Sequence, residues 1–88
     1  MVPTRATVRE WLSDLARGRI TREEASELAR PWVTDPEREA QITDLVLFEP
    51  LARLLGADLP TTGRPYLYGP SDFEGWLTDF ERSEPSAP

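Results

Sequence analysis

The sequence predicts an all-α fold, a small four-helix array with a long Pro/Gly-containing loop before the last helix. Apolar residues recur at helical spacing in four segments. Three Ser or Thr residues are followed at the third position by Glu, the pattern of a capping box at a helix start. Residues 57–70 hold three Pro and two Gly and form the longest loop. We therefore expect a single helical domain over residues 1–82 and a disordered C-terminal tail over residues 83–88.

The first helix is expected at about residues 8–17. A capping box of Thr7 and Glu10 marks its start, and Gly18 offers the left-handed conformation that ends many helices. Its apolar face consists of Val8, Trp11, Leu12 and Leu15.

The second helix follows a capping box of Thr21 and Glu24. Pro31 lacks an N–H and collides with the preceding turn, so the helix should end or kink near Arg30. Beyond it, Asp35 is the expected cap of one short helical turn. The apolar face of the second helix consists of Ala25, Leu28, Ala29, Trp32 and Val33.

Two more helices complete the predicted array. A helix from Thr43 to Gly56 should kink or restart near Pro50, although residues 45–48 also fit a short strand. The last helix, at about residues 72–81, should be capped by Ser71. We expect one core residue from each helix, namely Trp11, Leu28, Leu55 and Trp76.

Composition excludes several chemistries. The chain has no His, no Cys and no Lys, so it cannot form a Ser-His-Asp or Cys-His site, the usual zinc sites, a Schiff base or a P-loop. Only a paired-carboxylate acid/base site or an oxygen-ligand metal site could still be built. We predict no enzyme activity, no cofactor and no metal. No apolar run reaches the roughly 20 residues that span a bilayer, and no secretory signal is evident, so we expect a cytoplasmic protein that does not enter membranes. The all-arginine basic set favours a bacterial source.

Charge argues against a nucleic-acid partner. The net charge is −6, and residues 69–88 hold five acidic residues and one Arg. The stretch GRITREEASELA, with Arg17, Arg19 and Arg22 beside it, is similar to the turn and second helix of a helix-turn-helix. However, no basic recognition helix follows, and phosphate backbones need Lys and Arg on one face. The sequence therefore predicts a basic protein partner and no nucleic acid.

Two clusters are candidate partner-binding sites, each with two interpretations. Tyr66 and Tyr68 either lie over Trp11 or Trp76 with their hydroxyl groups at the surface, or form exposed anchors at a protein interface. The acidic face of the second helix is either solvated or provides a pair of carboxylates for a cation. The candidate residues are Tyr66, Tyr68, Asp72, Glu74, Asp79, Glu23, Glu24 and Glu27.

The acidic helix with Glu23, Glu24 and Glu27, and the tyrosine pair ahead of Pro70, resemble the small acidic bacterial immunity proteins that inhibit colicin-type nucleases. This resemblance implies a four-helix, non-enzymatic protein-binding module that inhibits a basic bacterial protein. The alternative is a structural or regulatory accessory domain that presents an apolar helical face to a larger assembly. Either protein would be a monomer or a small homo-oligomer.

Overall fold

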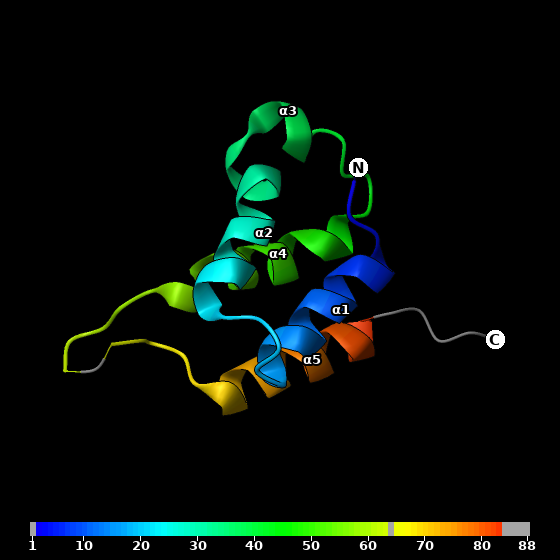
Figure 1. Ribbon diagram of the computed structural model, residues 1–88. Helices are drawn as coiled ribbons and strands as arrows, with labels where there is room; N and C mark the ends of the chain where they lie inside the picture. Colours follow the sequence, from blue (N-terminus) through cyan, green and yellow to red (C-terminus); the bar gives the residue numbers. More distant parts are fainter. Residues whose placement is uncertain (1, 64, 84–88) are drawn as a thin grey trace.

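The computed structural model describes residues 2–63 and 65–83, and these residues confirm the predicted all-α fold (Figure 1). Two longer helices, α1 (Arg5–Ala16) and α2 (Arg22–Thr34), are followed by the single turn α3 (Pro36–Glu39). The 3-10 turn η1 (Leu45–Leu47) leads into α4 (Phe48–Leu55), and η2 (Gly56–Asp58) precedes the loop to α5 (Pro70–Ser83). Four helices of eight or more residues therefore build the described part of the chain.

The helices pack as two pairs. α1 lies against α5, which runs in the opposite direction, and α2 lies against α4 (Figure 1). Their apolar faces meet in one core, which is supplied by every one of the four longer helices. The buried apolar residues are Val8, Leu12, Leu15, Ala25, Ala29, Trp32, Ile42, Leu47, Leu51, Leu54, Ala57, Phe73, Trp76 and Phe80.

The buried face of α2 differs from the predicted one. Leu28 is 37% exposed, so its prediction as a core residue is wrong, whereas Ser26 is buried. The Ser26 hydroxyl donates to the Leu55 carbonyl at 2.9 Å. A small hydroxyl residue can be buried here because this hydrogen bond satisfies it. Of the other predicted core positions, Trp76 is buried, while Trp11 and Leu55 are partly buried against the core.

The helix starts follow the caps only in part. Thr21 is the N-cap of α2, and both capping-box hydrogen bonds with Glu24 are present at 3.0 Å. α1 instead begins at Arg5 because Thr4, not Thr7, accepts from the first-turn backbone. α5 begins at Pro70, where Asp72 accepts from the Gly69 N–H at 2.8 Å, so Ser71 lies inside the helix. Pro in the first turn is favourable because its missing N–H would have no helical partner there.

The prolines within the second and third predicted helices have different effects. α2 continues through Pro31 to Thr34 and thereby brings Trp32 into the core. The helix therefore does not end near Arg30, and this part of the prediction is wrong. Pro50 lies in the first turn of α4, which restarts after η1 as predicted. Residues 45–48 are helical, which excludes the strand interpretation. The predicted cap Asp35 is confirmed, since it accepts from the Glu37 N–H at 3.0 Å.

The turn between α1 and α2 has a conformation that its glycine permits. Gly18 has a φ of 73°, in the left-handed region where residues with a Cβ are strained. The Arg19 N–H donates back to the Asp14 carbonyl at 2.8 Å, which closes the end of α1. Gly18 therefore ends the first helix as predicted and places arginines on both sides of the turn.

The predicted tail over residues 83–88 is tested only at its first residue. Ser83 ends α5, and residues 84–88 lie outside the described residues. The single-domain organisation over residues 1–82 stays a prediction. None of the helices in the described part of the chain combines the length and the apolar character that a membrane-spanning segment needs.

Candidate functional site

A connected group of polar contacts lies where segment 65–69 meets the start of α2. Arg22, the first residue of α2, has its guanidinium carbon 4.3 Å from the centre of the Tyr66 ring. Its Nη2 donates to the Tyr68 carbonyl at 3.2 Å. The Tyr66 hydroxyl in turn donates to Glu23 Oε1 at 2.6 Å. One arginine, one tyrosine and one glutamate therefore fasten this segment to α2.

The Tyr66–Glu23 hydrogen bond changes the acidity of both groups. The bond from the Tyr66 hydroxyl stabilises the charged carboxylate and lowers the pKa of Glu23. The same bond, together with the negative charge of Glu23, raises the pKa of Tyr66. At neutral pH the pair is therefore a neutral phenol donating to a carboxylate.

Tyr68 takes a different position from Tyr66. Its ring meets Trp76 edge-on, with the ring centres 4.9 Å apart, and it is only partly exposed. This is the structural interpretation that the sequence left open, in which a tyrosine covers Trp76. Tyr68 thus closes the core, while Tyr66 faces the start of α2.

The remaining acidic candidates have individual partners. Glu24 completes the capping box of Thr21, and Glu27 accepts from Arg30 Nε at 3.1 Å. Asp72 accepts from the Gly69 N–H. Glu23 and Glu27 thus each bind a different side chain, and no group of three potential metal ligands occurs among the described residues.

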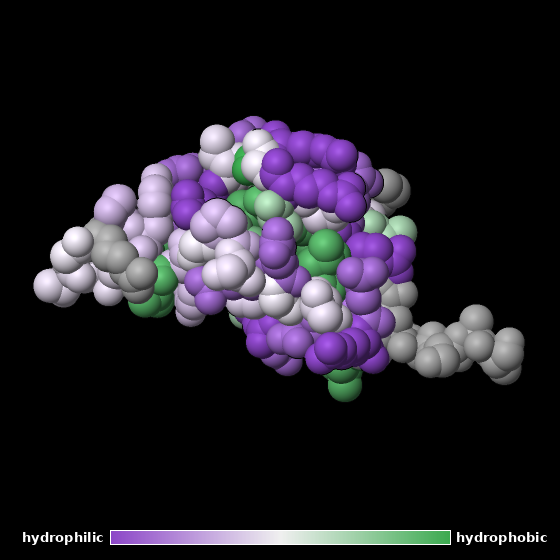
Figure 2. Space-filling view, turned by 90° about the horizontal axis from the view of Figure 1, so that it is seen from below, coloured by the Kyte–Doolittle hydropathy of each residue, from purple (hydrophilic) through white to green (hydrophobic). Residues whose placement is uncertain are grey.

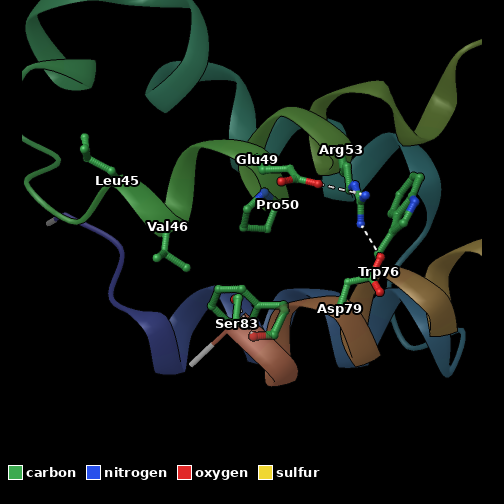
Figure 3. A pocket seen from close by; sticks show the side chains of 9 residues that line it. Leu45, Val46, Glu49, Pro50, Arg53, Trp76, Asp79 and Ser83 are labelled. Atoms are coloured by element: carbon green, nitrogen blue, oxygen red, sulfur yellow. Dashed lines mark hydrogen bonds and ion pairs between the residues drawn. The ribbon is translucent and has the colours of Figure 1, made fainter. Parts of the chain in front are cut away.

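Asp79 belongs to another part of the surface, a hollow between α4 and α5. Its Oδ2 accepts from Arg53 Nη1 at 3.1 Å, and Arg53 also pairs with Glu49 at 2.8 Å (Figure 3). Leu45, Val46 and Trp76 line the same hollow. Glu74, which is exposed, is on neither of these surfaces. The structure thus unites Tyr66 with Glu23 but separates Asp79 from that cluster.

The exposed apolar residues do not form the predicted helical face. The large apolar residues that are exposed in the described part of the chain come from two different elements and from the loop before α5; they are Leu28, Leu45, Leu59 and Leu67. Seen from below, the surface is mainly hydrophilic, and hydrophobic side chains appear as small separate areas (Figure 2). Isolated surface leucines of this kind are normal and do not indicate an interface.

A second feature, which was not among the predicted site residues, adjoins the Arg22–Tyr66 contact. Turn 17–21 carries the exposed side chains of Arg17 and Arg19, and Arg22 follows directly. Arg19 pairs with Asp14 at 3.3 Å but remains 61% exposed, and no carboxylate among the described residues pairs with Arg17. We call the surface formed by turn 17–21, Arg22 and segment 65–69 the turn face. Its sequence signal was three arginines within six residues.

The fold and the turn face define a small all-α protein whose first two helices are joined by an arginine-bearing turn. The chain matches the model of the YxzC DNA-binding protein family over residues 3–80 and belongs to this family. No curated protein and no solved structure matches the chain. The matched range contains all the longer helices except the last turn of α5, and the whole turn face.

This membership corrects the functional expectations from the sequence. The resemblance to immunity proteins is wrong, as are the protein-binding inhibitor that it implied and the alternative of an accessory domain. The exclusion of a nucleic-acid partner is also wrong, because the family is described as DNA-binding. The physical reason is that net charge averages over the whole surface, whereas a nucleic acid needs cations only on the face it contacts.

Proposed function

We propose that this protein binds DNA without catalysing a reaction, and that the turn face is its contact surface. The observation that carries the proposal is membership, over residues 3–80, in a family described as DNA-binding. The turn face is favoured over other surfaces because it brings three arginines together within six residues, and two of them, Arg17 and Arg19, are exposed. A DNA-binding role also agrees with the cytoplasmic location expected from the sequence.

The distribution of ion pairs supports this choice of surface. Arg5 is bound to Asp44, and that bond is the main reason why the pKa of Asp44 is lowered. Arg53 is held between two carboxylates, and Arg30 and Arg38 each pair with a carboxylate on their own helix or its cap. At turn 17–21 one arginine, Arg19, pairs with a carboxylate, that of Asp14. A phosphate group at this turn would therefore displace at most one ion pair.

The arrangement of the turn limits how strong the electrostatic attraction can be. Arg17, Arg19 and Arg22 provide two or three phosphate contacts, because Arg22 already donates to Tyr68. Each contact contributes about −0.9 to the slope of log K against log salt concentration on duplex DNA. A slope of about −2 to −3 is therefore expected. The net charge of −6 repels the phosphates at longer range. The complex should therefore be weaker the closer the acidic surface lies to the phosphates.

The test is fluorescence anisotropy with labelled oligonucleotides, single-stranded and duplex, over a series of salt concentrations. The double variant Arg17→Ala, Arg19→Ala should make the slope of log K against log salt concentration less negative by about 2. It should weaken binding to every DNA sequence equally. Arg38→Ala is the matched control, because it removes the same type of charge from α3, away from the turn. Absence of binding by the wild-type chain to either form of DNA, or equal weakening by Arg38→Ala, would refute the proposal.

A further inference from the structure

The turn face contains a hollow whose chemistry goes beyond phosphate binding. The hollow has a volume of about 550 Å³ and lies between the α1–α2 turn, the start of α2 and the start of α5. Leu15, Ile20 and Phe73 give it apolar walls. Arg17, Arg22 and Tyr66 give it cations and an aromatic ring, and the carboxylate of Glu23 lines it as well. A smaller hollow of about 240 Å³ is lined by Arg22, Tyr66 and Tyr68. Arg22 and Tyr66 therefore border both.

Tyr66 is held in place before any ligand arrives. Its ring lies against the Arg22 guanidinium, and its hydroxyl is bonded to Glu23. Arg22 is itself fixed by the Tyr68 carbonyl and lies 5.2 Å from the centre of the Phe73 ring. A ring fixed on several sides loses little conformational freedom on binding, which favours affinity.

The acidic surface of α2 argues against binding in a groove of duplex DNA. A helix-turn-helix protein places its second helix in the major groove, with that helix's first residues at the base edges. Here the corresponding exposed residues are Glu23, Glu24 and Glu27. Docking α2 in the groove would bring three carboxylates between two rows of phosphates. Of these three carboxylates only that of Glu23 lines the hollow, so a single strand that lies along the turn meets less repulsion between like charges.

We infer that the turn face binds single-stranded DNA, with an unpaired base stacked beside Tyr66 in the hollow and the adjoining phosphates at Arg17 and Arg19. This inference rests on the proposed function and specifies its ligand. Stacking on aromatic rings and arginine accepts any base, because every base has a flat π surface. It also depends little on net charge. Stacking thus explains how a chain with a charge of −6 and only a few available arginines binds DNA.

The first arm of the test compares one labelled oligonucleotide as a single strand and as a duplex of the same length, at one salt concentration. The single strand should bind about tenfold or more tightly, because only its bases can enter the hollow. Equal or tighter binding of the duplex overturns the inference while leaving the proposed function standing. If neither form binds, the proposed function fails, and the inference fails with it.

The second arm isolates the Tyr66 ring. Tyr66→Leu should weaken single-strand binding by about five- to hundredfold, the loss measured when a stacking aromatic is removed. Tyr66→Phe keeps the ring, loses only the hydroxyl bond to Glu23, and should retain most of the affinity. Circular dichroism establishes that both variants remain helical. Unchanged binding by a folded Tyr66→Leu variant would overturn the inference, whatever the first arm shows.

Discussion

Replacing Arg22 with alanine should detach segment 65–69 from α2 and lower the free energy of unfolding. Two contacts of its guanidinium with the rings of Tyr66 and Phe73 contribute about 0.5–1 kcal/mol each. The charged hydrogen bond to the Tyr68 carbonyl contributes about 1.5–3 kcal/mol. Truncation also removes the buried Nε of Arg22, which has no hydrogen-bond partner among the described residues. Removing this unpaired donor should raise the free energy of unfolding by about 1–3 kcal/mol. Taken at their middle values, these contributions give a net loss of about 2 kcal/mol.

Urea unfolding followed by circular dichroism measures this loss. Arg17→Ala is the matched control, because Arg17 is an exposed arginine in the same turn that pairs with no carboxylate in the described chain. Its removal should change the free energy of unfolding by about 0.5 kcal/mol or less. Equal stabilities of the two variants would show that the contacts of Arg22 do not hold the segment. Arg22→Ala should also weaken DNA binding, since the position of the Tyr66 ring depends on it.

Three further predictions concern the core, the caps and the titration of the turn face. Trp76→Ala should lower the free energy of unfolding by about 3–5 kcal/mol, because Trp76 is 9% exposed and contacts two aromatic rings; a urea midpoint like that of the parent would contradict the packing. Thr21→Ala should lower the free energy of unfolding by about 1 kcal/mol and Ser71→Ala should leave it almost unchanged, since Thr21 caps a helix and Ser71 does not. Equal losses in thermal melts would refute that assignment. The Tyr66–Glu23 bond stabilises the fold at neutral pH and is lost as pH falls through the lowered pKa of Glu23 or rises through the raised pKa of Tyr66. Glu23→Gln should therefore bring the pKa of Tyr66 in a tyrosinate absorbance titration back toward its ordinary value, and an unchanged pKa would exclude the bond.

The helices were predictable because their apolar spacing is local information. The errors lie where two local signals compete. Thr4 and Thr7 are both acceptable caps, and the earlier one is used. At α5 the pattern from Ser71 suggested a capping box, but Pro70 fits the first helical position and moves the start of the helix forward. Pro31 interrupts one backbone hydrogen bond, while the burial of Trp32 beyond it compensates for that loss.

The candidate site was predictable only in its components. Tyr66 and Glu23 were both proposed, but their contact joins residues 43 positions apart and depends on how the loop returns to α2. The arginines at positions 17, 19 and 22 were noted and then set aside because no basic recognition helix follows them and the chain is acidic overall. A sum over the chain does not show that arginines elsewhere, among them Arg5, Arg30 and Arg53, are paired with carboxylates, whereas the turn brings several arginines together. That distribution becomes visible only in three dimensions.

The central claim, that DNA contacts the turn face, is tested most directly by nuclear magnetic resonance. A labelled sample of the wild-type chain is titrated with a short single-stranded oligonucleotide, and the backbone amide signals are followed. The claim predicts that the largest shifts fall on residues 17–23 and 65–69, while α3 and the hollow between α4 and α5 change little. Shifts concentrated on α3 or around Arg53 and Asp79, with the turn unaffected, would contradict it.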